Sequence, residues 1–141
     1  MKKLILSWFT VDSRALGIYR ILIGCVCALD IIRRWNYIDV FYSSKAISIN
    51  PSKSAFNIFN YIGNSSVEIH IIFLIGILFS IFLAIGYKSK ISHFIVAIII
   101  IGIHSQVTEV ANSGDMFLTA MLVWTLFLPL GKSLSLDALI N

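Results

Sequence analysis

Charged side chains are scarce in this chain, and their scarcity excludes most soluble proteins. Of the 141 residues, 13% are charged and 58% are hydrophobic, whereas a soluble domain is about one-quarter charged and about half apolar. A soluble fold of this length has too little interior to bury so many apolar side chains. The net charge of +4 does not indicate nucleic-acid binding, because the basic residues lie at the ends of apolar runs, as they do beside membrane spans.

Cysteine, proline and glycine are also few. The chain has two cysteines, two prolines and eight glycines, which excludes a disulfide scaffold and a collagen-like fibre. Cys25 and Cys27 lie two residues apart in an apolar run, so on a helix they point to different faces and cannot bond to each other. No Cys-x-x-Cys motif or Cys/His cluster indicates zinc or haem, and we expect both cysteines to be small core residues.

Long apolar runs are what the sequence does contain. A membrane-spanning helix needs about 20 mostly apolar residues, and backbone groups in lipid must form their hydrogen bonds within their own segment. The sequence therefore predicts an all-α integral membrane protein, a single domain with four transmembrane helices. The expected spans are residues 13–35, 67–85, 91–110 and 115–130, of which the fourth is short.

The connection between the first two spans is long and rich in aromatic residues. Asn50 is a good helix N-cap, Pro51 suits the first helical position, and Gly63 suits the helix end. Apolar residues between them recur on one helical face. We expect a short helix over residues 51–62 that lies in the membrane interface; an ordinary soluble loop is the alternative.

The distribution of Lys and Arg predicts the orientation. With four spans both termini share one side, which collects six of these residues against four on the other side. Because Lys and Arg are enriched in cytoplasmic loops, we expect both termini in the cytoplasm. Frequent Ile, Lys, Ser and Asn suggest a bacterium with AT-rich DNA, so we expect its inner membrane.

The first predicted span combines small residues with a charge. Gly17, Gly24 and Ala28 fall on one stripe, and such stripes let helices approach closely. Arg20 lies beside the stripe, about 12 Å of helix rise from Asp12, and a charge at that depth needs a partner. No acidic residue is expected at the same depth. Arg20 therefore either extends to the surface or meets a lipid phosphate, another protein segment, or an anionic or carbonyl-bearing ligand.

Polar residues gather at the other membrane face. Because successive spans alternate in direction, the end of the first span and the turn between the third and fourth lie on the same side. One interpretation is an ion-pair network that ties helix ends together; the other is a polar site open to the non-cytoplasmic side. The candidate residues are Asp30, Arg33, Arg34, Glu109, Asn112 and Asp115.

Two of these positions have simpler explanations as well. Turn chemistry explains Asn112. Asp115 is expected either to favour the dipole of the fourth helix or to be a buried partner of Arg33 or Arg34. His70 and His104 alone are a weak metal signal, so the sequence assigns no metal ligand and no catalytic residue.

Several motifs resemble one family. The segment 12–24, which reads DSRALGIYRILIG, followed by Asp30 and Arg33-Arg34-Trp35, resembles the opening of HTTM-domain proteins, membrane proteins related to vitamin K-dependent gamma-carboxylase. The resemblance continues at residues 112–115, which read NSGD, and at residues 127–137, which read FLPLGKSLSLD. It covers nearly the whole chain but only the amino-terminal half of a typical member. Four-helix DoxX-like membrane proteins are similar in size and layout and are the alternative relatives.

The resemblance implies a membrane scaffold with a quinone-like or lipid ligand. It does not carry over carboxylation, because the carboxylase needs a lysine within its membrane core and the lysines here lie in flanks or loops. No cofactor is evident beyond the quinone that the resemblance implies, and enzymatic activity is left open.

Three functions follow as hypotheses. The first is a scaffold or accessory subunit in the lipid bilayer, which associates with itself or with other membrane subunits; the glycine stripe and an unpaired Arg20 favour it. The second is a membrane enzyme that acts with a quinone-like or lipid ligand. A transporter is the third, and the lack of a broken helix pair or internal repeat disfavours it.

Overall fold

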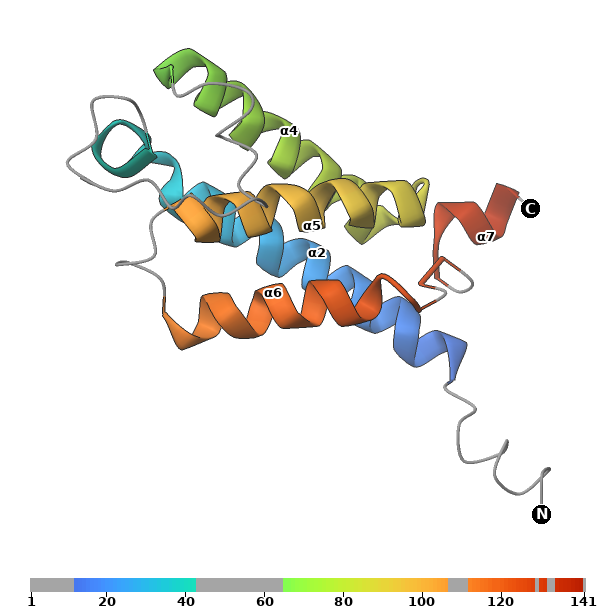
Figure 1. Ribbon diagram of the computed structural model, residues 1–141. Helices are drawn as coiled ribbons and strands as arrows, with labels where there is room; N and C mark the ends of the chain where they lie inside the picture. Colours follow the sequence, from blue (N-terminus) through green and yellow to red (C-terminus); the bar gives the residue numbers. More distant parts are fainter. Residues whose placement is uncertain (1–11, 43–64, 107–111, 129, 132–133, 141) are drawn as a thin grey trace.

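The computed structural model describes residues 12–42, 65–106, 112–128, 130–131 and 134–140, which contain helices and no strand. In Figure 1, α5 lies between α4 and α6, and α2 packs against both α4 and α5. The elements are α2 (Ser13–Trp35), a π-helical turn η1 (Ile38–Tyr42), α4 (Ser66–Ile85), α5 (Ser89–Gln106), α6 (Ser113–Thr125) and the short α7 (Leu136–Ile140).

Three helices among the described residues are long and apolar enough to cross a membrane. They are α2, α4 and α5, with 23, 20 and 18 residues. The all-helical class is confirmed for the described part of the chain, and these helices indicate a multi-pass membrane protein. Most of the fourth expected span, 115–130, forms α6, which has 13 residues and ends at Thr125, short of the usual length. The interfacial helix expected over 51–62 lies outside the described residues.

Local sequence explains where several helices begin and end. The Asp12 side chain accepts a hydrogen bond from the Arg14 N–H at 2.9 Å and caps the start of α2. Asn112 and Asp115 form a reciprocal capping box at the start of α6. Gly86, with a φ of 83°, ends α4 in the left-handed conformation that glycine tolerates best.

The glycine stripe of α2 is used inside the chain. A Cβ atom added to Gly24 would lie 2.8 Å from the Ala84 nitrogen and 2.9 Å from the Ser80 oxygen, so α2 and α4 approach closely there. Gly17 is buried as well, and Ala28 is half-buried. Gly24 therefore faces α4 of the same chain and gives no support for association with another protein molecule, because a small-residue stripe predicts close helix approach without specifying which helix approaches.

Arg20 also finds its partners inside the chain. Its side chain is fully buried, and Nη2 donates to the carbonyl oxygens of Leu134 at 2.5 Å and Ala84 at 3.4 Å. The expectation that Arg20 lacks a partner within this chain is wrong. Residues 134–137 return to the turn between α4 and α5, and the pattern of apolar runs did not predict this return.

Asp137 holds this returning segment in place. Its carboxylate accepts hydrogen bonds from the backbone N–H groups of Lys88 and Ser89 at 2.8 and 2.7 Å, and from the Ser89 hydroxyl at 2.7 Å. Burial by itself would raise the pKa of Asp137, but these donors and the nearby Arg20 charge lower it below its ordinary value. The Asp137 carboxylate therefore caps α5 and contributes to the surroundings of Arg20.

Replacing Gly24 by Leu should destabilise the folded chain by at least about 1–3 kcal/mol, because the new side chain would collide with the α4 backbone. Cys25→Leu is the matched control, since Cys25 is exposed on the same helix and the change should cost under about 0.5 kcal/mol. The free energies of unfolding of both variants in detergent check this, and equal values would contradict the α2–α4 contact.

Candidate functional site

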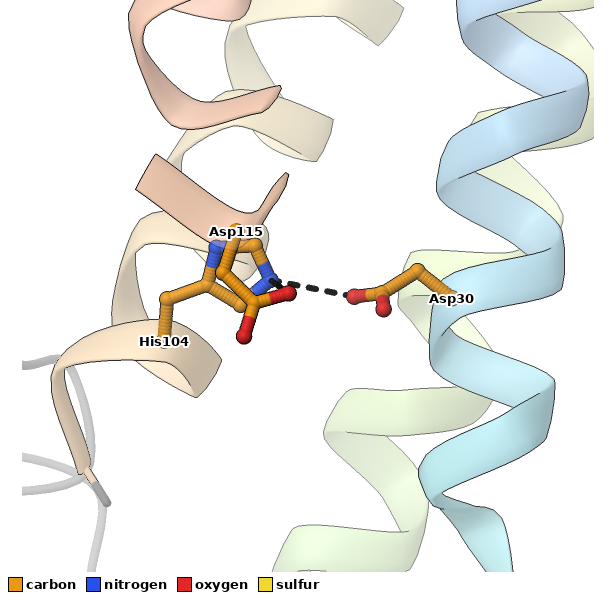
Figure 2. A group of neighbouring side chains, drawn as sticks. All are labelled: Asp30, His104 and Asp115. Atoms are coloured by element: carbon orange, nitrogen blue, oxygen red, sulfur yellow. Dashed lines mark hydrogen bonds and ion pairs between the residues drawn. The ribbon is translucent and has the colours of Figure 1, made fainter. Parts of the chain in front are cut away.

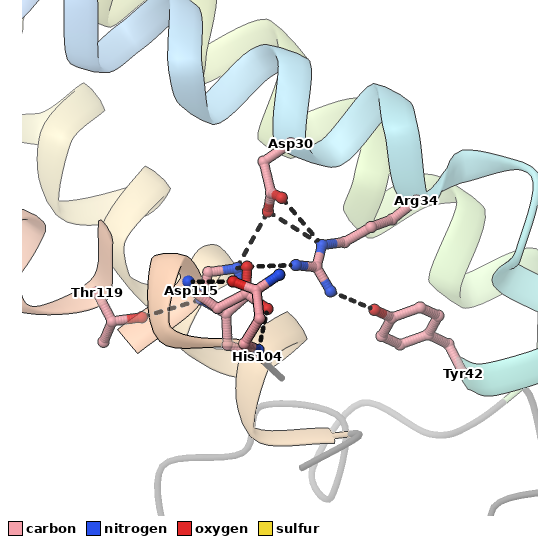
Figure 3. Close-up of polar contacts among 7 residues, drawn as sticks. Asp30, Arg34, Tyr42, His104, Asp115 and Thr119 are labelled. Carbon is pink, nitrogen blue, oxygen red and sulfur yellow. Dashed lines mark hydrogen bonds and ion pairs between the residues drawn. The ribbon is translucent and has the colours of Figure 1, made fainter. Parts of the chain in front are cut away.

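Arg34 is the centre of a charged cluster at the end of α2. Its Nη2 donates to Asp115 Oδ1 at 2.7 Å, and its Nε lies 3.1 Å from both oxygens of Asp30. Nη1 donates to the Tyr42 hydroxyl at 3.2 Å. Figure 3 shows the guanidinium between the two carboxylates and the tyrosine. We call Asp30, Arg34, His104 and Asp115 the charged cluster.

His104 joins α5 to this cluster. Its Nε2 lies 3.0 Å from Asp30 Oδ2, and its Nδ1 lies 3.0 Å from the Thr119 hydroxyl oxygen. Nε2 also lies 3.8 Å from Asp115 Oδ1, so both carboxylates of the charged cluster approach this nitrogen. His104 thereby connects α5 with α2 and with α6.

The local sequence places each acid where Arg34 can reach it. Asp30 and Arg34 are four residues apart, so they are neighbours on one face of α2. Asp115 is the third residue of α6, where its Oδ2 accepts from the Asn112 N–H at 3.1 Å. Both interpretations of Asp115 therefore hold together: it caps the helix, and with 6% exposure it is a buried partner of Arg34 rather than of Arg33.

Of the predicted site residues that the structure describes, Arg33 is not part of this network. Arg33 is exposed, and it forms no hydrogen bond or ion pair with another described residue. Glu109 lies outside the described residues. The structure adds Tyr42 and Thr119, which sequence reasoning missed because isolated hydroxyl-bearing residues carry no motif.

The cluster also contains metal-ligating atom types. Asp30, His104 and Asp115 each bring a ligand atom within 4.8 Å of the other two, and Figure 2 shows these side chains pointing toward one another. Arg34 already donates to both carboxylates, so its positive charge would lie beside any bound cation. The geometry therefore suits an ion-pair network better than a metal centre.

A groove between α2 and α6 leads to the charged cluster. Its volume is about 650 Å³. Its walls are mostly apolar, and Asp30, Arg33, Asn112 and Asp115 line one end. We call it the α2–α6 groove. Its main apolar lining residues are Leu22, Val26, Leu29, Phe117, Leu118 and Met121.

A second, more polar pocket of about 510 Å³ adjoins the cluster on the side of η1. Arg34, Tyr37 and Tyr42 are among its lining residues. Asp30 and Arg33 line both this pocket and the α2–α6 groove. The charged residues at the end of α2 thus face two adjoining hollows.

No family model, no curated protein and no solved structure matches this chain. The resemblance to HTTM-domain proteins and the alternative relation to DoxX-like proteins therefore stay predictions. The groove and the charged cluster are therefore the features that bear on function.

Arg34→Gln should destabilise the folded chain by about 3–5 kcal/mol, because it leaves two largely buried carboxylates without their counter-charge. Arg33→Gln, the matched control on the exposed neighbour, should cost under about 1 kcal/mol. Unfolding free energies in detergent give both values.

Asp115→Asn extends this test to a double-mutant cycle. The loss in free energy of unfolding in the double variant Asp115→Asn/Arg34→Gln should be clearly smaller than the sum of the losses in the two single variants, because the two side chains interact directly. Additive costs, or equal costs for the two arginine variants, would contradict the central position of Arg34.

Proposed function

We propose that this chain is a multi-pass membrane protein that binds an amphiphilic membrane molecule, a lipid or a quinone-like compound, in the α2–α6 groove. The observation that carries the proposal is the composition of the groove, whose long apolar walls end at charged groups. Ligand sites between helices commonly combine apolar walls with a few placed polar groups. An amphiphile matches both parts at once.

The length of the groove supports this proposal. Its lining on α2 extends from Tyr19 to Arg33, which is about 21 Å of helix rise. One leaflet of the hydrocarbon core is about 15 Å thick, half of the whole core. The groove is therefore long enough for a hydrocarbon chain that enters from one leaflet.

Membership of the HTTM family, a bacterial inner-membrane location and cytoplasmic termini belong to the same proposal, with α6 as a fourth span in a thin part of the bilayer. In this orientation the charged cluster faces the non-cytoplasmic side. The resemblance supports a quinone-like or lipid ligand. The proposed role of the chain is to bind this ligand, and any enzymatic use of it would take place in the same groove.

An accessory subunit of a larger membrane assembly is the second candidate function. The observation that favours it is an exposed aromatic face along and just beyond α6, where Phe117, which also lines the groove, Trp124 and Phe127 are all exposed. A helix of a partner protein could pack on this face. Gly24 and Arg20 no longer support this candidate, because both are engaged inside the chain.

Native mass spectrometry of the chain released from mild detergent tests the two candidates. We expect single chains that carry amphiphile-sized adducts, and at least a several-fold loss of adducts in Val26→Trp, which fills the groove. Ile32→Trp is the matched control, because Ile32 is equally exposed on α2 and does not line the groove.

One result would overturn the proposed ligand site, and another would favour the accessory subunit. Adducts that persist in Val26→Trp at the level of the control would overturn the proposed ligand site. Assemblies with a second protein and without adducts would instead support the accessory subunit.

A further inference from the structure

Two hollows of different character meet at Arg33, near the end of α2. The α2–α6 groove and the polar pocket beside η1 share Asp30, Arg33 and Asn112 as lining residues. The walls of the groove are mostly apolar, whereas Asn36 and Tyr37 add polar groups to the pocket beside η1. An amphiphile whose hydrocarbon chain lies in the groove would therefore place its polar group at this junction.

The junction offers hydrogen-bond donors that are not in use. Arg33 is exposed and forms no hydrogen bond or ion pair with another described residue. Asn112 is exposed as well, and its Oδ1 accepts from the Asp115 N–H at 3.1 Å, which leaves the NH₂ group of its amide as a donor. A guanidinium has five N–H donors and no acceptor.

The carboxylate oxygens at the junction already have partners. Both oxygens of Asp30 lie 3.1 Å from Arg34 Nε, and Oδ2 also lies 3.0 Å from His104 Nε2. Asp115 Oδ1 accepts from Arg34 Nη2, and its Oδ2 accepts from the Asn112 N–H. Because Arg34 bonds to both carboxylates, this holds for either protonation state of His104. The groups left to satisfy are donors, so a ligand group made of acceptors complements them.

Among the polar groups of membrane amphiphiles, a phosphodiester matches Arg33 most closely. It carries a full negative charge, and its oxygens can accept two parallel N–H bonds from one guanidinium. A quinone carbonyl or the hydroxyl of a diacylglycerol is neutral, so either group would gain a hydrogen bond without an ion pair. A glycerophospholipid joins the phosphodiester to acyl chains that suit the apolar walls of the groove.

We infer that the α2–α6 groove binds a glycerophospholipid and that Arg33 holds its phosphate. The phosphodiester lies between the Arg33 guanidinium and the Asn112 amide, and an acyl chain lies against apolar walls that include Val26 and Leu29. The remainder of the headgroup extends into the pocket beside η1. This inference rests on the proposed function, since it names the ligand class of the same groove.

Native mass spectrometry of the full chain, titrated with lipids of identical acyl chains, tests this inference. Phosphatidylglycerol and phosphatidylcholine carry the phosphate, whereas diacylglycerol lacks it, and a long-chain quinone is the fourth probe. Both phospholipids should bind about tenfold more tightly than the other two probes, as expected for a hydrogen bond to a charged group. Arg33→Gln should remove most of this preference, and Arg14→Gln, the control on an exposed arginine at the other end of α2, should leave it unchanged.

Glycerol phosphate distinguishes a lipid from a soluble source of the same phosphate group. We expect an excess of glycerol phosphate to leave bound phosphatidylglycerol in place, because it has no acyl chain for the apolar walls of the groove. Displacement of the lipid by glycerol phosphate would overturn the assignment of a lipid ligand.

The remaining outcomes separate this inference from the proposed function. Equal binding of all four probes, tight binding of only one phospholipid, or equal behaviour of Arg33→Gln and Arg14→Gln would overturn the phosphate assignment. If Val26→Trp abolished such unselective binding, the proposed function would stand without the phosphate assignment. Lipid binding that persisted in Val26→Trp at the level of Ile32→Trp would overturn the proposed function itself.

Discussion

The cost of removing a charge from water is the constraint on which this structure depends. Asp30 and Asp115 come from α2 and α6 and are largely buried, and the single guanidinium of Arg34 bonds to both. His104 extends the same network to α5 through Asp30. Removing one partner leaves the others charged and unpaired in a low-dielectric setting. Loss of any one of these interactions therefore destabilises the whole junction between α2, α5 and α6.

A second arginine, in the amino-terminal half of α2, is under the same constraint and meets it in part, since its Nε and Nη1 form no hydrogen bond with a described residue. Arg20 is buried against backbone carbonyls of Ala84 and Leu134, and Asp137 adds its charge while it caps α5. Two arginines of one helix, 14 positions apart, thus each attach a later segment of the chain to α2. The α2–α6 groove lies along the surface of α2 and ends at the Arg34 network.

Part of this arrangement could be predicted from sequence. The first apolar run, predicted over residues 13–35, corresponds to α2, and the expected alternation of the helices predicted that Asp30, Arg34 and Asp115 lie close together, as their ion pairs show. The close neighbour of Gly24, the carbonyl partners of Arg20 and the early end of α6 could not be predicted. Each of these depends on which segments pack together, and the apolar pattern within one segment does not show which other segment it contacts.

Amide hydrogen exchange most directly tests whether Arg34 fixes α6 to α2. In Arg34→Gln the amides in the first turn of α6, from Asp115 onward, should lose protection, while amides at the end of α4 beside Arg20 keep theirs. Arg33→Gln should change neither region. Unchanged protection in the first turn of α6 after loss of Arg34 would contradict the account, because α6 would then be held by apolar packing alone.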